Sequence, residues 1–315
     1  MSAAAVPLSR ADRPATGILA EVGNTPLVRV ERVVNGLIPA GVEIHAKLEW
    51  FNPGGSVKDR AALSMVLAAE RDGRLRPGMT ILDASSGNTG IAYAMVAAAR
   101  GYRLALCLPA NANAERKRTL RAYGAEIIET SPLEGSDGAI LEARRRVADA
   151  PDRYVYLDQY SNDANWQAHF RTTGPEIWAQ TAGRVTHWVA TLGTTGSFTG
   201  TARFLKAQNP AVQAVSLQPD GPFHGLEGVK HLETAMVPGI YDPALADANL
   251  GVPTDAAQAL VRRLAREEGL LAGISAGAAL WGAIEVARTL TRGVVVTLFP
   301  DGGSRYLSDT HLWEG

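Results

Sequence analysis

The chain has 315 residues, of which 46% are hydrophobic, 20% charged and 6% aromatic. This is enough apolar material for more than one core of ordinary size, and it excludes a low-complexity disordered chain. The 31 basic and 32 acidic side chains leave a formal charge of -1, which argues against a nucleic-acid or membrane-surface protein. Because no stretch is as apolar as a membrane helix and residues 1–17 lack a secretory signal pattern, we expect a cytoplasmic protein.

Strand-length apolar runs alternate with helical patterns along most of the chain, with an irregular stretch at 219–250. This alternation predicts an α/β fold with parallel twisted sheets flanked by helices, in which ligands bind at the carboxyl ends of strands. A compact block between residues 50 and 155 suggests two lobes. In chain order the predicted elements are strand 44–49, helix 56–71, strand 80–84, helix 89–99, strand 103–108, helix 114–123, strand 125–129, helix 138–148, strand 154–158, helix 164–181, strand 186–192, helix 199–206, strand 212–218, helix 254–267, strand 270–274, helix 276–290 and strand 294–299.

Cysteine and histidine usage limits the possible chemistry. The single cysteine, Cys107, excludes an intrachain disulfide and a cysteine-based zinc site, and its apolar surroundings indicate a buried strand residue. The histidines show no metal-ligand spacing, and H-E-x-x-H does not occur. We therefore expect no metal in the site.

The first of four candidate loops is Asn52-Pro-Gly-Gly-Ser-Val-Lys-Asp-Arg60, which leads into predicted helix 56–71. Pro and Gly shape a turn, Ser56 can cap the helix, and Lys58 falls in the first turn. One interpretation is a surface lysine paired with Asp59. The other is a reactive lysine, because a helix N-terminus favours the neutral amine that a nucleophile and base requires.

The second loop, Ser85-Ser-Gly-Asn-Thr-Gly90, places hydroxyls, an amide and backbone N–H groups before helix 89–99. Such a group of donors suits a small carboxylate, although an ordinary capped turn has the same composition. The third loop, Gly193-Thr-Thr-Gly-Ser-Phe-Thr-Gly200, combines glycines and hydroxyls at a helix start. It lacks the dinucleotide and P-loop fingerprints, so we expect it to bind a phosphate monoester.

The fourth loop, Gly273-Ile-Ser-Ala-Gly277, matches the G-x-S-x-G nucleophile elbow. Asp301 and His311 follow in the Ser-Asp-His order, so a serine hydrolase using Ser275 is an alternative of a different class. Little chain separates Ser275 from His311, and this hypothesis leaves the other three loops without a role.

Together these motifs resemble the cysteine synthase family of pyridoxal-phosphate enzymes, also called O-acetylserine sulfhydrylases. They follow the family order over nearly the whole chain and look most like the B-type isozyme. The matching stretches are Gly23-Asn-Thr-Pro-Leu27, Asn52–Arg60, Ser85–Gly90, Thr172-Thr-Gly-Pro-Glu-Ile-Trp178, Arg184-Val-Thr-His187, Gly193–Gly200, Gly273–Gly277 and Arg305-Tyr-Leu-Ser308.

The resemblance implies a fold-type II architecture like that of the tryptophan synthase β subunit. Residues 1–52 would pack largely with the larger lobe, 53–155 would form a smaller mobile lobe, and 156–315 would form the lobe that binds the cofactor phosphate. The implied cofactor is pyridoxal 5′-phosphate, and the implied assembly is a homodimer with small-molecule substrates. The implied reaction replaces the acetoxy group of O-acetyl-L-serine by sulfide, or by thiosulfate, giving L-cysteine or S-sulfocysteine and acetate.

The resemblance also implies roles for individual residues. Lys58 matches the lysine that forms the Schiff base and removes the α-proton, and Asn88 matches the asparagine at the cofactor's 3′-oxygen. The phosphate loop corresponds to Gly193, Thr194, Thr195, Gly196 and Ser197. The substrate carboxylate site corresponds to Ser85, Ser86, Thr89 and Gln159, with Ser85 standing where the family usually has Thr.

Several alternatives stay open. Ser275 matches the B-type serine that meets the pyridine nitrogen, but Asp301 competes for this position. A cystathionine β-synthase core, an O-phosphoserine sulfhydrylase and a serine dehydratase share the fold, and motifs do not decide the leaving group or the sulfur donor. Lys230 and His231 stand where B-type relatives carry two arginines, and we expect them near the entrance of the site.

Overall fold

The computed structural model describes residues 16–85 and 87–314. The chain divides into two compact units. Of the described residues, the larger unit contains Gly23–Val57 and 166–314, and the smaller unit contains 16–22 and Lys58–Asn165. The sequence predicted boundaries near residues 50 and 155, and the mobility of the smaller lobe stays a prediction.

A six-stranded sheet forms the centre of the larger unit, in the order β1-β2-β10-β7-β8-β9. Its strands run parallel except β1, which pairs antiparallel with β2. The sequence predicted parallel strands only, and it did not predict β1 or β9. The strands are β1 (Leu27–Val30), β2 (Val42–Leu48), β7 (His187–Thr191), β8 (Gln213–Pro219), β9 (Ala248–Val252) and β10 (Gly293–Phe299).

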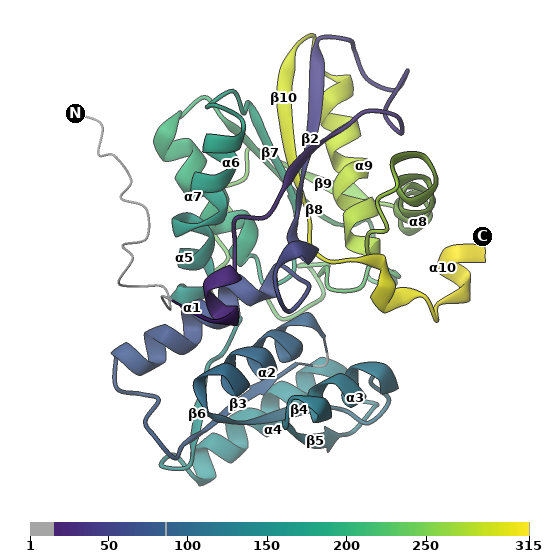
Figure 1. The fold of residues 1–315 in the computed structure, drawn as a ribbon. Helices are drawn as coiled ribbons and strands as arrows, with labels where there is room; N and C mark the ends of the chain where they lie inside the picture. The colour runs from purple at the N-terminus through teal and green to yellow at the C-terminus, as the bar shows by residue number, and fades with distance from the viewer. Residues whose placement is uncertain (1–15, 86, 315) are drawn as a thin grey trace. The chain divides into compact units, whose positions relative to one another are not determined.

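Helices cover both faces of this sheet, with α8 and α9 on one side and α6 and α7 on the other (Figure 1). Strand β10 shows why, since Val295 and Phe299 join the core under α9 while Val294, Val296 and Leu298 join the core under α7. Alternate residues of a strand point to opposite faces, so a continuous apolar run is buried on both sides. The helices are α5 (Asp163–Arg171), α6 (Thr173–Gln180), α7 (Gly196–Gln208), α8 (Thr254–Arg263), α9 (Ile274–Arg288) and α10 (Thr310–Glu314).

The smaller unit has a four-stranded parallel sheet in the order β5-β4-β3-β6. Helix α4 packs on one face, and α1, α2 and α3 lie on the other (Figure 1). Cys107 of β4 is fully buried, as the sequence predicted. The elements are α1 (Lys58–Arg71), β3 (Thr80–Ala84), α2 (Asn88–Arg100), β4 (Arg103–Pro109), α3 (Ala114–Ala122), β5 (Glu126–Thr130), α4 (Gly135–Asp149) and β6 (Tyr154–Tyr156).

Beyond differences in bounds, three predicted elements differ from the structure in type or continuity. The predicted helix 164–181 is broken at Thr172, whose hydroxyl donates to the carbonyl of Ala168 at 2.7 Å, a bond that bends helices. The predicted helix 254–267 ends in a π-helical turn over Leu264–Glu268. The predicted strand 270–274 is wrong, because the segment forms only an isolated bridge between Ala272 and Gly302.

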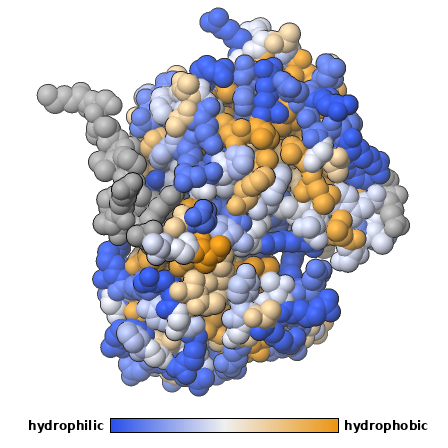
Figure 2. Space-filling view, viewed as in Figure 1, coloured by the Kyte–Doolittle hydropathy of each residue, from blue (hydrophilic) through white to orange (hydrophobic). Residues whose placement is uncertain are grey.

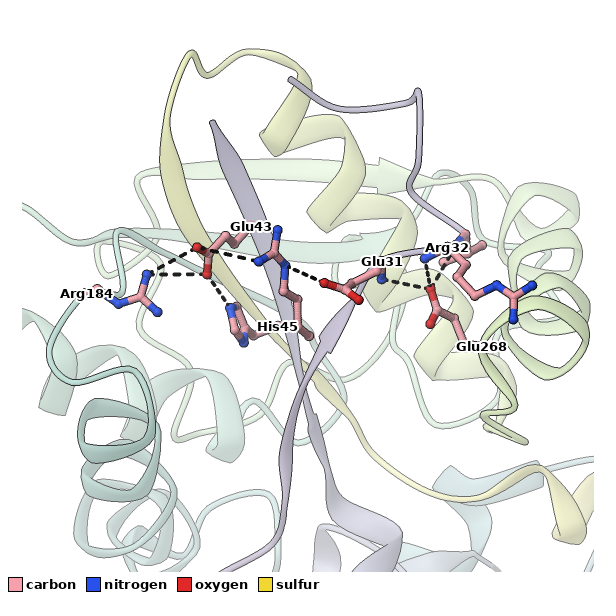
Figure 3. Close-up of polar contacts among 8 residues, drawn as sticks. Glu31, Arg32, Glu43, His45, Arg184 and Glu268 are labelled. Atoms are coloured by element: carbon pink, nitrogen blue, oxygen red, sulfur yellow. Dashed lines mark hydrogen bonds and ion pairs between the residues drawn. The ribbon is translucent and has the colours of Figure 1, made fainter. Parts of the chain in front are cut away.

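Two carboxylates organise the β1–β2 region (Figure 3). Glu268 accepts three consecutive backbone N–H groups, those of Glu31, Arg32 and Val33, at 2.9, 2.5 and 2.9 Å. Glu43 of β2 receives a hydrogen bond from His45 at 2.9 Å, and Arg184 lies 3.4 Å away. These contacts, with His45 the strongest, hold the pKa of Glu43 below its ordinary value although burial opposes the shift.

The surface carries both polar and apolar residues. In the view of Figure 2 hydrophobic residues lie in several separate groups among hydrophilic ones. No helix in residues 16–85 or 87–314 is long and apolar enough to cross a membrane.

Candidate active site

The loop that precedes Lys58 is fixed by a buried polar network in the larger unit. Asn52 donates to the Glu49 carboxylate at 2.8 Å, and its own side-chain oxygen accepts the N–H of Gly23 at 2.8 Å. The Thr25 hydroxyl donates to the other oxygen of Glu49 at 2.7 Å. The network therefore explains why two motifs distant in the sequence, at residues 23–27 and 52–60, occur together. Sequence reasoning missed Glu49, a fully buried carboxylate whose position just before the second motif was its only signal.

Lys58 follows this loop directly and is the first residue of α1, in the smaller unit. The side chain is partly buried, and the next two residues, Asp59 and Arg60, are buried. The interpretation of Lys58 as a surface lysine paired with Asp59 and its interpretation as a reactive lysine both stay predictions. Lys58 lies in the first turn of α1, at the positive end of the helix dipole.

The loop after β3 brings together three of the predicted substrate residues within the smaller unit. The Ser85 hydroxyl accepts the N–H of Gly90 at 3.1 Å. The Thr89 hydroxyl donates to the Gln159 side-chain oxygen at 2.8 Å, and the Gln159 amide donates to the carbonyl of Ala84 at 3.3 Å. Asn88 begins α2 in the same loop, whereas Ser86 lies outside the described residues.

The predicted phosphate loop joins β7 to α7 in the larger unit. A Cβ at Gly193 would lie 2.4 Å from the carbonyl oxygen of Gly228, so only glycine fits there. Thr195 precedes the helix in a left-handed conformation with φ of 69°, and Gly196 begins it. The loop also contains Thr194 and Ser197. The first N–H groups of a helix have no intrahelical acceptor and therefore point toward any anion placed before them.

Two hydroxyls at this helix start are buried and have no hydrogen-bond partner among the described residues, those of Thr195 and Thr199. A buried hydroxyl without a partner costs about 1–3 kcal/mol, so such groups normally serve a ligand or a water. A phosphate oxygen is a strong acceptor for both hydroxyls and backbone N–H groups. The loop therefore fits the phosphate of a cofactor.

Ser275 and Asp301, the two candidates for the pyridine nitrogen, both belong to the larger unit. Ser275 is buried in the first turn of α9. Asp301 is buried just after β10, and its carboxylate accepts the Tyr306 hydroxyl at 2.6 Å. The other oxygen of Asp301 would lie 2.0 Å from a Cβ at Gly273, so this glycine makes room for the carboxylate. Sequence reasoning missed the bond to Tyr306, which engages Asp301 from within the protein.

The geometry does not support a serine hydrolase. A nucleophile elbow needs a strand, a strained turn and then a helix. No strand of the described chain leads directly into α9, and Ser275 is not among the described residues with positive φ. His311 is exposed on the short α10, and the Asp301 carboxylate bonds to Tyr306. The structure therefore does not meet the requirements of a serine hydrolase, and this hypothesis is wrong.

The amino-acid sequence is similar to those of known enzymes. Residues 18–301 match the pyridoxal-phosphate dependent enzyme family. The chain is 54% identical to a cysteine synthase of Aquifex aeolicus, covering 92% of this chain and 90% of the relative. It is 46% identical to cysteine synthase B of Pseudomonas aeruginosa, covering 91% and 94%.

The fold is also similar to that of solved enzyme structures. The crystal structure of a cysteine synthase from Entamoeba histolytica superposes with a TM-score of 0.91 at 33% identity, covering 99% of this chain and 94% of that chain. The likeness extends over nearly the full length of both proteins, and the fold is that of fold-type II pyridoxal-phosphate enzymes. The chain therefore belongs to the cysteine synthase family of pyridoxal-phosphate dependent enzymes.

Proposed function

We propose that this protein is a cysteine synthase that replaces the acetoxy group of O-acetyl-L-serine by sulfide, giving L-cysteine and acetate. The observation that carries the proposal is the phosphate loop, where the unpartnered Thr195 hydroxyl stands at the start of α7 in a chain that matches the family over residues 18–301. The cofactor is pyridoxal 5′-phosphate. When bound, it withdraws electrons from the α-carbon of an amino acid.

The roles that we assign toward the cofactor follow the motifs of the family. Lys58 would attach the cofactor covalently, and Asn88 would hydrogen-bond its 3′-oxygen. The loop Gly193–Ser197 would hold the phosphate through backbone N–H groups and the Thr195 hydroxyl. Ser275 is the proposed partner of the pyridine nitrogen, since the carboxylate of Asp301 already accepts a hydrogen bond from Tyr306.

The substrate carboxylate is assigned to the loop after β3. Ser85 and Thr89 carry hydroxyls there, Gln159 bonds to Thr89, and Ser86 belongs to the same loop. Binding the anion requires these hydroxyls to turn from their internal partners toward the ligand. The loop would hold the carboxylate while the Lys58 amine acts on the α-hydrogen.

The reaction then needs one proton carrier. The free Lys58 amine takes the proton from the α-carbon, and the electron pair of that C–H bond expels acetate as the Cβ–O bond breaks. Sulfide forms a bond to the β-carbon, and the Lys58 ammonium returns its proton to the α-carbon. The sum is one C–O bond exchanged for one C–S bond, with no oxidant or reductant required.

We also propose thiosulfate as an alternative sulfur donor, a cytoplasmic location and a homodimeric assembly, all on the likeness to cysteine synthases. Reactions of related chemistry differ in the leaving group or the nucleophile, as in an O-phosphoserine sulfhydrylase, a cystathionine β-synthase or a serine dehydratase. The following test separates the reactions that differ in the leaving group.

The test begins with the visible absorbance spectrum of the purified protein. A yellow protein whose band changes on addition of O-acetylserine, and which releases cysteine when sulfide is added, supports the proposal. The same titration with O-phosphoserine and with serine compares the leaving groups. A spectrum that responds to O-phosphoserine but not to O-acetylserine, or a colourless protein that hydrolyses esters, would refute it.

A further inference from the structure

A buried carboxyl lies directly behind the proposed substrate loop. Asp83 of β3 is 1% exposed, and one of its oxygens accepts the N–H of Ala84 at 2.7 Å. The other oxygen, Oδ2, is buried as well, and the Tyr93 hydroxyl lies close enough to the carboxyl to act on its pKa. Only Ala84 separates Asp83 from Ser85, the first residue of the loop. The mechanism proposed above gives Asp83 no role.

The surroundings of Asp83 favour its neutral form. The Tyr156 hydroxyl is also buried, and Arg144 lies 3.7 Å from Asp158. Burial raises the pKa of Asp83 to about 7 and the nearby Asp158 adds to the rise, although hydrogen bonds from Ala84, Tyr93 and Gln159 oppose it. The titratable groups that face Asp83 are Tyr93 of α2, Cys107 of β4, Tyr156 of β6, and Asp158 and Tyr160 after β6.

A short path of hydrogen bonds connects Asp83 to the loop. The backbone N–H of Ala84 donates to Asp83, and the Ala84 carbonyl accepts a hydrogen bond from the side-chain amide of Gln159. The same amide group presents its oxygen to the Thr89 hydroxyl. Asp83, Gln159 and Thr89 are therefore fixed relative to one another through a single residue.

We propose that Asp83 is a positioning residue for the carboxylate of the amino-acid substrate. When the Asp83 carboxyl is neutral, the substrate carboxylate is the only negative charge at the loop. When Asp83 is ionised, a second negative charge lies behind the same loop. The inference rests on the proposed function, which assigns the ligand of the loop. Coulomb repulsion in a poorly solvated interior is strong, so ionisation of Asp83 weakens binding of the anion. The stronger bond that ionised Asp83 would accept from Ala84 does not offset this repulsion, because it acts away from the ligand.

The test measures the affinity of the holoenzyme for L-alanine, which has no leaving group on its β-carbon. Dissociation constants come from the visible spectrum between pH 6 and pH 8.5, for the wild type and for Asp83→Asn. The amine of the ligand titrates identically in both experiments, so it cancels when the two proteins are compared. We expect the wild-type constant to rise about tenfold more than that of Asp83→Asn across this range, which corresponds to about 1.4 kcal/mol.

Two controls separate this role from a merely structural one. L-Alaninamide lacks the carboxylate, so the two proteins should bind it with the same pH dependence. Asp83→Glu keeps an acid at this position and should restore the pH dependence for alanine. Asp83→Ser provides a second neutral variant in case Asp83→Asn does not fold, as judged by circular dichroism.

The outcomes are distinct. Parallel pH profiles for alanine in the wild type and the neutral variants would overturn the role of Asp83 and leave the proposed function intact. An equal effect on alaninamide would show that Asp83 acts on the fold of the loop and not on the anion. A holoenzyme whose spectrum responds neither to alanine nor to O-acetylserine would overturn the proposed function, and the role of Asp83 with it.

Discussion

The two candidate ligand loops of this protein treat their hydroxyl groups in opposite ways. In the loop after β3, Ser85 and Thr89 already bond to groups of the smaller unit. In the loop before α7, the hydroxyls of Thr195 and Thr199 are buried without a partner among the described residues. The Ser85 and Thr89 hydroxyls therefore have partners within the protein, whereas the Thr195 and Thr199 hydroxyls have none among the described residues.

This difference matches the ligands that we assign. A substrate must leave after each turnover, and a loop that recovers its own hydrogen bonds makes release easier. A cofactor stays bound through many turnovers, so its loop can keep donors whose burial is compensated only when the phosphate is present. The contrast predicts that cofactor binding stabilises the larger unit strongly, whereas substrate binding changes stability little.

The largest expected effect tests whether the two loops serve one reaction at all. Lys58→Ala removes the only proton carrier that we assign, so turnover of O-acetylserine should fall by at least about a thousandfold. Cysteine formation and the visible spectrum would both be measured. Lys206→Ala is a matched control, because that lysine pairs with Asp247 at 2.6 Å on the surface and should keep full activity. Wild-type colour and turnover in Lys58→Ala would show that another residue is the catalytic lysine.

A second substitution tests the unpartnered hydroxyl itself. Thr195→Val keeps the shape of the side chain and should weaken cofactor binding about tenfold, or about 1.4 kcal/mol. The free energy of unfolding of the cofactor-free protein should stay equal or rise, because a buried hydroxyl without a partner is removed. Spectroscopic titration with the cofactor and urea unfolding measure the two quantities.

Thr297→Val is the matched control for this experiment. The Thr297 hydroxyl is fully buried in the same unit and donates to the carbonyl of Val189 at 2.8 Å. Its removal should lower the free energy of unfolding by about 1 kcal/mol and leave cofactor affinity unchanged. If the two variants behaved alike, the contrast between satisfied and unsatisfied hydroxyls would have no energetic meaning.

Substitution of Ser275 tests which residue is the partner of the pyridine nitrogen. As the partner of the pyridine nitrogen, Ser275→Ala should leave the cofactor bound and slow turnover about tenfold. Asp301→Asn keeps an oxygen to accept the Tyr306 hydroxyl and should change turnover less. The cofactor spectrum and the rate of cysteine formation distinguish the two. A larger loss in Asp301→Asn than in Ser275→Ala would reverse the assignment.

The pH dependence of stability tests the smaller unit without any ligand. Burial raises the pKa of Asp83 to about 7, above its value in the unfolded chain. The stability that depends on the neutral carboxyl is therefore present at pH 4 and lost as the pH rises through 7. Asp83→Asn should abolish this loss, which we expect to be on the order of 1–2 kcal/mol, in urea unfolding at pH 5 and pH 8.

Glu142 gives the opposite sign in the same unit. A hydrogen bond from Arg145, with help from Arg146, lowers the pKa of Glu142 to about 2. Its contribution is present above the ordinary value of a glutamate and is lost as the pH falls toward 2. Glu142→Gln should therefore leave the change between pH 5 and pH 8 untouched. A change in that range would show that residues other than Asp83 control it.

The sequence predicted most of the fold because the central strands are apolar on both faces. Runs such as 80–84 and 294–299 have few alternatives to a buried parallel strand. Strands β1 and β9 lack this signal, because each has only one buried residue, and both were missed. The apolar residues at 270–274 were misread as a strand, although they lead into α9 and bury without strand pairing.

The candidate site shows a similar division. A glycine- and hydroxyl-rich motif before a helix, as at Gly193–Ser197, can be recognised in the sequence, because such residues suit a helix start that binds an anion. Glu49 and Asp83 carry no such pattern. Each acts through a hydrogen bond to a residue far away or to a neighbouring peptide group, and only the folded chain shows the partner.

A last prediction concerns the segment that lies against the phosphate loop. The backbone N–H of Lys230 donates to the carbonyl of Leu192 at 2.8 Å, and Gly228 contacts Gly193. Lys230 is therefore anchored next to the loop that we assign to the cofactor, and its charge should attract anionic sulfur donors. Thiosulfate carries two charges and hydrosulfide one, so Lys230→Ala should raise the KM for thiosulfate about tenfold, or about 1.4 kcal/mol, and the KM for sulfide little. The effect should shrink at high salt, because mobile ions screen the attraction. Equal changes for both donors that do not respond to salt would show that Lys230 supports the segment and does not meet the substrate.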